Sequence, residues 1–125
     1  MLSGIPMLCG RTVALKQSWA LQTMGIELVW EEENGTELAR LSDSQSLLQG
    51  FLPSESALEF SCLRFVDPYG DTIFNTLQIP VLLHELNSLA SNPLEPRVAE
   101  HLHKAISLVA NAQGHIHTYI RFVGD

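Results

Sequence analysis

The sequence predicts an α+β fold in which a single antiparallel sheet carries two helices packed on one face. Three observations support it. Apolar and polar residues alternate from Ile26 to Glu31, two apolar stripes at helical spacing lie between Ile79 and Ala112, and the last β-rich segment follows both helices. Strands and helices therefore do not alternate along the chain, as a parallel doubly wound sheet would require. An antiparallel sheet can also leave its second face open to solvent.

A first hairpin is predicted near the start of this domain. Residues 26–31 alternate as a half-buried strand does, and the Asn34-Gly35 pair favours a tight turn. Residues 37–41 form the returning strand. Residues 42–50 are polar apart from Leu47 and Leu48, and we expect a short helix there that begins at an Asp or Ser cap.

A second hairpin is predicted around the turn motif Asp67-Pro68-Tyr69-Gly70-Asp71. Residues 57–66 are rich in β-forming side chains and predict a strand on which Leu63 and Phe65 share the core face. An aspartate that bonds its own backbone, a proline with a fixed φ and a glycine that tolerates positive φ together favour a type I turn. Residues 71–75 return as the partner strand, so Asp71 is expected to meet Arg64 across the hairpin.

Two helices are predicted after this hairpin. Pro80 suits a first helical turn, because its missing N–H costs nothing there, and Asn92-Pro93 ends that helix. The second apolar stripe runs from Val98 to Ala112, and Gly114 is a suitable C-terminal cap. The last strand covers residues 115–123.

One core is expected to hold the fold together, because each fully buried large apolar side chain contributes roughly 1.5–3 kcal/mol. Its predicted members are Trp30, Leu63, Phe65, Leu82, Leu86, Leu102, Ile106, Ile120 and Phe122. A chain of 125 residues allows one domain, which we assign to residues 24–125.

Residues 1–23 differ in composition from the rest of the chain. They contain Arg11 and Lys16 but no acidic residue, whereas all 14 acids follow. Arg11 interrupts the apolar stretch, so a secretory signal is disfavoured. We expect either that the natural start is Met24 or that residues 1–23 are a loose extension; the competing interpretation is a short packing helix over residues 13–21.

Composition excludes several classes of function. With 46% apolar and 17% charged residues, the chain is expected to fold rather than remain disordered. A net charge of −7 argues against nucleic-acid binding, and no stretch reaches the roughly 18 uncharged apolar residues of a membrane span. Cys9 and Cys62 are the only thiols, so we expect cytoplasmic localisation and a buried, inert Cys62.

The candidate ligand-binding residues are predicted on outward strand faces, four of them spaced two apart on the last strand. They are Arg64, His115, His117, Tyr119 and Arg121. Arginine binds an anion through two hydrogen bonds, and histidine can move a proton near neutral pH. The alternative is an ordinary solvated face on which each arginine pairs with a nearby acid: Glu27, Glu59 or Asp71.

No catalytic residue, metal or cofactor is predicted. His115 and His117 could chelate a metal, but no third ligand lies at a recognisable spacing. Asp67 and Asp71 flank the turn motif, and turn formation explains them without acid–base chemistry. The sequence also has no Gly-x-Ser-x-Gly elbow and no glycine-rich phosphate loop.

The stretch from Arg64 to Asn75, with Leu77-Gln78 after it and residues 120–125 at the end, resembles an uncharacterised family of small bacterial proteins. The turn motif of that family is D-P-Y-G-D-T-[VI]-F-N. The resemblance covers residues 24–125 and favours a start at Met24. It implies no activity, cofactor or ligand, so no functional residue is carried over from it.

The function is therefore predicted by elimination. We expect a small cytoplasmic binding or regulatory module that acts through protein contacts, with a protein partner or a second copy in a homodimer, and we favour this class over an enzyme. A narrower form is an immunity-type inhibitor of a basic toxin, which the net charge suggests. The alternative is a small-molecule binder or enzyme that holds an anionic ligand on the open sheet face.

Overall fold

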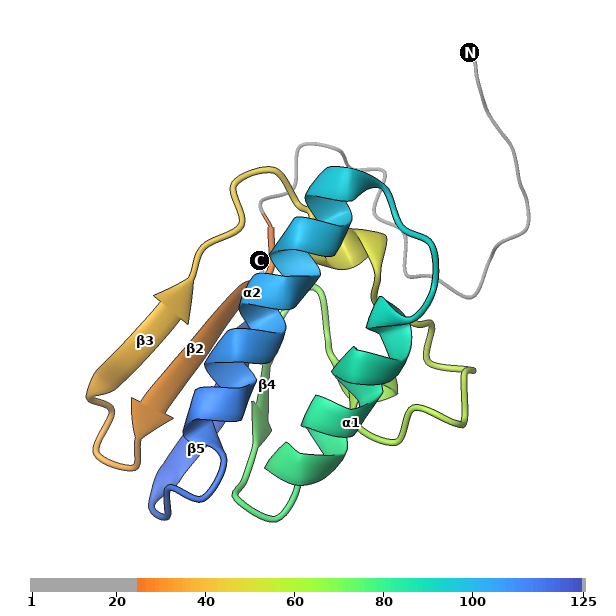
Figure 1. Ribbon diagram of the computed structural model, residues 1–125. Coiled ribbons are helices and arrows are strands. Elements are labelled where there is room, and N and C mark those ends of the chain that lie inside the picture. Colours follow the sequence, from red (N-terminus) through yellow and green to blue (C-terminus); the bar gives the residue numbers. More distant parts are fainter. Residues whose placement is uncertain (1–24, 125) are drawn as a thin grey trace.

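A computed structural model describes residues 25–124 of the chain (Figure 1). The predictions for residues 1–23 and for a start at Met24 lie outside the described residues. In chain order the elements are β2 (Glu27–Glu32), β3 (Glu37–Leu41), η1 (Leu48–Gly50), η2 (Leu63–Phe65), β4 (Asp71–Phe74), α1 (Ile79–Ala90), α2 (Pro96–Ala112) and β5 (Thr118–Val123). Within this range, no helix is long and apolar enough to cross a membrane.

The four strands of the described region form one antiparallel sheet in the order β3-β2-β5-β4. The last strand in sequence is thus an inner strand, and β3 and β4 are the two edges. Both helices lie on the same side of the sheet, as Figure 1 shows. The predicted α+β fold, with one antiparallel sheet and two helices on one face, is confirmed.

Local chemistry explains where the elements begin and end. The β2–β3 turn contains Gly35 at a φ of 94°, and Asn34 Oδ1 accepts from the Thr36 amide at 2.8 Å. At the start of α2 the carboxylate of Glu95 accepts from the amides of Arg97 and Val98, at 3.0 and 3.1 Å. The predicted cap Gly114 follows α2 with a φ of 86°.

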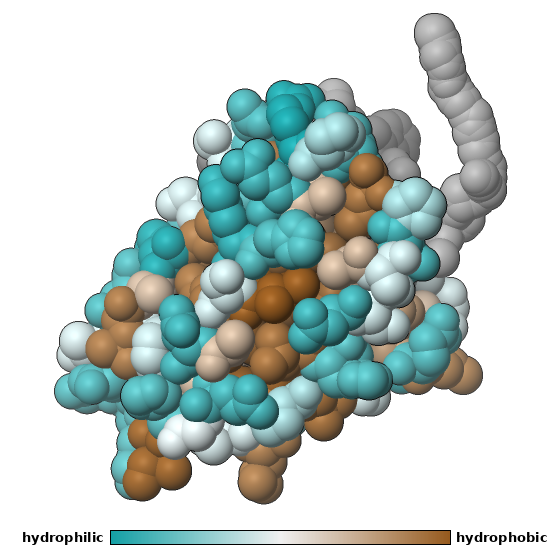
Figure 2. Space-filling model, viewed as in Figure 1, coloured by the Kyte–Doolittle hydropathy of each residue, from teal (hydrophilic) through white to brown (hydrophobic). Residues whose placement is uncertain are grey.

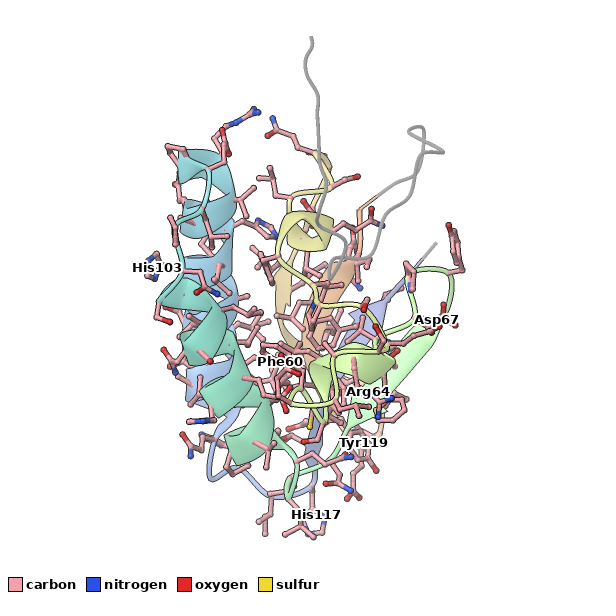
Figure 3. The ribbon with its side chains drawn as sticks, turned by 90° about the vertical axis from the view of Figure 1, so that its right-hand side faces the viewer. Phe60, Arg64, Asp67, His103, His117 and Tyr119 are labelled. Atoms are coloured by element: carbon pink, nitrogen blue, oxygen red, sulfur yellow. The ribbon has the colours of Figure 1, made fainter. Side chains whose placement is uncertain are left out.

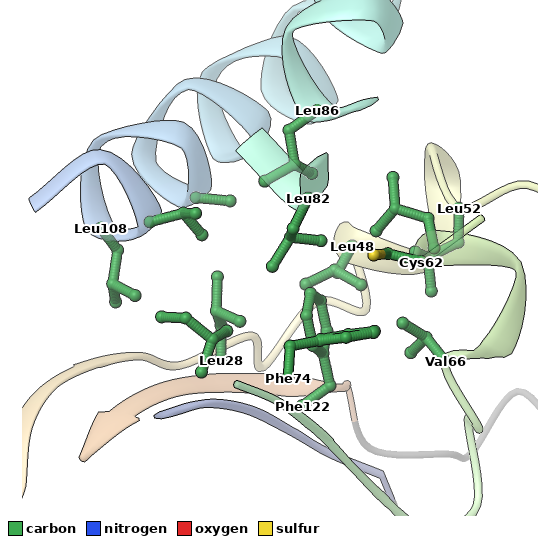
Figure 4. Close-up of a cluster of buried hydrophobic side chains, with 14 of the residues drawn as sticks. Leu28, Leu48, Leu52, Cys62, Val66, Phe74, Leu82, Leu86, Leu108 and Phe122 are labelled. Carbon is green, nitrogen blue, oxygen red and sulfur yellow. The ribbon is translucent and has the colours of Figure 1, made fainter. Parts of the chain in front are cut away.

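The core lies between the helices and the inner face of the sheet (Figure 4). Phe74 and Phe122, from neighbouring strands, meet edge to face with ring centroids 5.7 Å apart. Apolar side chains also gather on the helix side, between α1 and α2, whereas most of that surface is hydrophilic (Figure 2). Six predicted core residues are fully buried: Leu63, Leu82, Leu86, Leu102, Ile120 and Phe122.

Three predicted core residues differ from expectation. Trp30 and Ile106 are only partly buried, although they pack against the core. Phe65 is 60% exposed, so its assignment to the core was wrong. The error follows from the assumption of a strand, in which Leu63 and Phe65 share a face; in a 3-10 turn they do not.

The predicted strand over residues 57–66 is wrong: this segment consists of turns and the single 3-10 turn η2. Local turns take the amides of Phe60, Phe65 and Val66, and Glu85, a 4% exposed side chain on α1, binds two more. Its carboxylate accepts from the amides of Cys62 and Leu63, at 3.1 and 2.9 Å, and from the Ser61 hydroxyl at 3.1 Å. Amides that converge on one carboxylate cannot also bond to a neighbouring strand, so the segment curls instead.

Several other predicted boundaries and contacts also differ from the structure. β4 pairs with β5, not with residues 57–66, and Asp71 bonds to Arg121, not to Arg64. The predicted helix in residues 42–50 is the single 3-10 turn η1. The last strand begins at Thr118, not at residue 115. The predicted turn is present, with the Gly70 amide 3.3 Å from the Asp67 carbonyl, although Gly70 has no positive φ.

Replacing Glu85 with alanine is expected to lower the free energy of unfolding by roughly 2–4 kcal/mol, because two buried amides lose their acceptor. Glu85→Gln keeps one acceptor oxygen and should lose less. Urea unfolding measures both changes, and Glu100→Ala on the exposed face of α2 is the control, expected within about 0.5 kcal/mol of wild type. A loss no larger for Glu85→Ala than for the control would contradict this role.

Candidate functional site

The histidines predicted to share a strand face do not lie on a strand. His115 and His117 precede β5, and His117 has a φ of 62°, which turns the chain away from strand geometry. His117 Nδ1 lies 2.9 Å from Glu33 Oε2, and the His115 ring packs edge-on against Trp30 with centroids 5.2 Å apart. The predicted row of four side chains on one face is therefore wrong.

Arg121 is on the open face of β5, as predicted, and is bound to two acids. Its guanidinium donates to Glu31 Oε1 at 2.9 Å and to Asp71 Oδ2 at 3.1 Å. Burial works against the charged form, but the hydrogen bonds that Arg121 donates to Glu31 and Asp71, with the charges of these acids, outweigh it and raise the pKa of Arg121. The alternative weighed from the sequence, an arginine paired with Asp71, is what this geometry supports.

Arg64 lies on η2, not on a strand beside β5. Its Nε donates to the Glu55 carbonyl at 2.8 Å, and its guanidinium stacks 4.6 Å above the Phe65 ring. Figure 3 shows His117 at one end of the molecule, with Arg64 and Tyr119 above it. Of the predicted set, β5 brings only Tyr119 and Arg121 onto one face.

The Asp67–Asp71 turn motif positions the start of β4. Asp67 Oδ1 accepts from the Tyr69 amide at 2.9 Å, and the Asp67 amide donates to Thr72 Oγ1 at 2.9 Å. A Cβ on Gly124 would lie 2.6 Å from the carbonyl oxygens of Asp67 and Pro68, so only glycine fits there. Because Thr72 and Gly124 belong to the helix face, the turn packs on that face and not along the outer side of β4.

The outer edge of β4 is accordingly open. The Gly124 amide donates to the Gly70 carbonyl at 2.7 Å, which fixes which residues of β4 bond to β5. By the alternation of an antiparallel ladder, Thr72 and Phe74 face β5, and the N–H and C=O groups of Asp71 and Ile73 point outward. No hydrogen bond within residues 25–124 joins these outward groups to another segment.

One exposed apolar side chain belongs to this edge strand: Ile73 is 53% exposed. Phe65 and Tyr69, which precede β4 in the sequence, are each 60% exposed. The opposite edge, β3, exposes Leu38 but also carries Arg40, which is paired with Glu27 and Glu37. Charged side chains protect an edge strand from pairing, so β4 is the edge better suited to contact another chain.

Two buried polar residues on the helices were missed from the sequence. Glu85 and His101 are 4% and 6% exposed. Each lies at the helical spacing of its apolar stripe, Glu85 between Leu82 and Leu89 and His101 four residues before Ala105. A polar residue at an apolar position of a helix was the sequence signal that could have indicated its burial.

No protein-family model, curated protein or solved structure matches the chain. Among residues 25–124 no cluster of three or more His, Cys, Asp or Glu side chains is placed to hold a metal ion. What the chain binds has therefore to be inferred from its own surface.

Cys62 is buried, as predicted, and burial followed by the charge of Glu85 raises the pKa of its thiol to about 11. A raised pKa leaves less thiolate at any given pH. In a Cys9→Ser variant, Cys62 should therefore react with the thiol reagent DTNB at pH 8 at least about 100-fold more slowly in the native state than in urea. Equal rates in the two states would contradict both the burial and the raised pKa.

Proposed function

We propose that this chain is a protein-binding module that acts by strand pairing at the outer edge of β4. The observation that carries the proposal is the open edge itself, where the N–H and C=O groups of Asp71 and Ile73 point outward. An added strand gains main-chain hydrogen bonds there, and exposed Ile73 supplies an apolar contact.

The occupant that we propose is a second copy of the chain, in antiparallel orientation. Hydrogen-bonded pairs in such a ladder form between outward-facing residues, so the register centred on Thr72 pairs Asp71 with Ile73 of the other copy. Each of the two symmetric pairs then exchanges both of its hydrogen bonds. The same register places the two Thr72 side chains opposite each other, a favourable cross-strand pair.

Charge permits this register, because Asp71 is the only charged residue of β4. Within one copy Asp71 is already bound to Arg121, which lowers the repulsion between the two edges. The net charge of −7 opposes association, so pairing should strengthen as salt screens it.

Two other functions stay predictions. Inhibition of a basic toxin rests on the net charge alone. Anion binding on the open sheet face finds no support at Arg121, whose guanidinium is held by Glu31 and Asp71. Cytoplasmic localisation likewise stays a prediction.

Sedimentation velocity of the full chain should show a concentration-dependent dimer. Ile73→Lys places a charge on the open edge and should weaken the dimer at least about ten-fold. The fold should survive, because Ile73 is 53% exposed; a thermal melt checks this.

Leu38→Lys is the matched control, because Leu38 is an exposed apolar residue on the other edge strand. It should leave the dimer unchanged. A monomer at every concentration up to about 100 µM would overturn the second copy as occupant. A dimer lost with Leu38→Lys but kept with Ile73→Lys would assign pairing to β3 and overturn the role of β4.

A further inference from the structure

A second surface feature, separate from the sheet edge, is a hollow of about 190 Å³ between α2 and the segment before η1. Its lining residues are Gln45, Leu47, Arg97, Glu100, His101 and Lys104. In a chain with net charge −7, three side chains that can carry positive charge meet at this one place, against a single lining acid.

The two permanent cations of the hollow are only loosely paired. Arg97 Nε is 3.6 Å from the Glu95 carboxylate, and Lys104 Nζ is 3.8 Å from that of Glu100, both beyond hydrogen-bond distance. By contrast, Arg40 and Arg121 each donate to two carboxylates. Arg97 also donates to Gln45 Oε1 at 3.3 Å, which holds its guanidinium at the rim of the hollow.

His101 forms the inner part of the lining and is 6% exposed. Its Nε2 is buried with no hydrogen-bond partner among the described residues and lies 3.9 Å from Asp43 Oδ1. Asp43 is itself fully buried, and its carboxylate accepts from the amides of Leu47 and Leu48, at 2.7 and 2.8 Å. Nε2 therefore faces the buried carboxylate of Asp43, and a protonated ring, which carries a donor on both nitrogens, would supply a donor to that carboxylate.

Three effects set the pKa of His101. Burial lowers its pKa, the charge of Asp43 raises it, and Lys104 lowers it further. Glu100 and Arg97 are the other charged residues that line the hollow. An anion placed there would add negative charge next to the ring and favour the imidazolium, which could then also donate to Asp43.

We propose that this hollow binds a small oxyanion, held by Arg97 and Lys104, and that His101 takes up a proton when the anion binds. Arginine and lysine donate charge-assisted hydrogen bonds to oxyanions of the phosphate, sulfate and carboxylate classes. Proton uptake makes binding tighter at lower pH, by up to about ten-fold per pH unit across the titration of His101.

Sulfate is the probe of choice, because it does not itself titrate between pH 5 and 8. Imidazole NMR signals of the full chain are followed with pH, in sodium sulfate and in sodium chloride at matched ionic strength. We expect sulfate to raise the apparent pKa of His101 and to leave that of His103 unchanged. His103 is the internal control, because it projects from the outer side of the same helix (Figure 3).

The double variant Arg97→Gln, Lys104→Gln should lose the sulfate effect while keeping the fold, since both side chains are more than half exposed. Acetate and phosphate titrations, each against matched chloride, then distinguish carboxylate from phosphate-type ligands. The proposal is overturned if sulfate and chloride give the same His101 titration, if His103 shifts equally, or if the double variant responds as wild type does.

Discussion

The carboxylate of Glu85 gathers three hydrogen-bond donors from a stretch of chain more than twenty residues away. It reaches them from the buried face of α1, where an uncompensated charge would be strongly unfavourable. Without those donors the buried carboxylate would have no hydrogen-bond partner. Without the carboxylate, the buried amides of Cys62 and Leu63 would have no acceptor. The helix layer and the segment before β4 thus stabilise each other.

This constraint decides the shape of the sheet. With two amides bonded to Glu85 and others bonded in local turns, the segment over residues 57–66 does not lie alongside β4 as a strand, and β4 pairs with β5. The Asp67–Gly70 turn then packs over Gly124 on the helix face, where a side chain would not fit. The open outer edge of β4 and the exposed Phe65 both accompany this arrangement, and the edge is the surface proposed for strand pairing.

The same constraint explains what the sequence could and could not predict. The β2–β3 hairpin, α1 and α2 follow from local patterns, because alternation, Asn-Gly, Pro80 and Gly114 act within a few residues. The segment 57–66 has the composition of a strand, but a carboxylate distant in sequence overrides that preference. His115 and His117 were wrongly placed on β5 because the spacing of two between them is typical of a strand. That spacing gives no sign of the positive φ of His117.

The predicted ligand-binding residues show why a site is harder to predict from sequence than a single helix or hairpin. Arg121 was correctly placed on the open face, but its two acids come from β2 and β4, and only the register of the sheet brings them together. Asp43 and His101 meet across nearly sixty residues, so no local pattern links them. Glu85 and His101 were nevertheless visible as polar residues within apolar stripes, and polar residues at such positions point to buried hydrogen-bond networks.

The link between Glu85 and the open edge of β4 is tested most directly by amide hydrogen exchange in dilute solution. The account predicts slow exchange at Cys62 and Leu63, whose amides bond to Glu85, and fast exchange at Asp71 and Ile73, whose amides point outward. Slow exchange at Asp71 and Ile73 in the dilute monomer, together with fast exchange at Cys62 and Leu63, would contradict it. That result would mean that residues 57–66 cover the β4 edge as a strand.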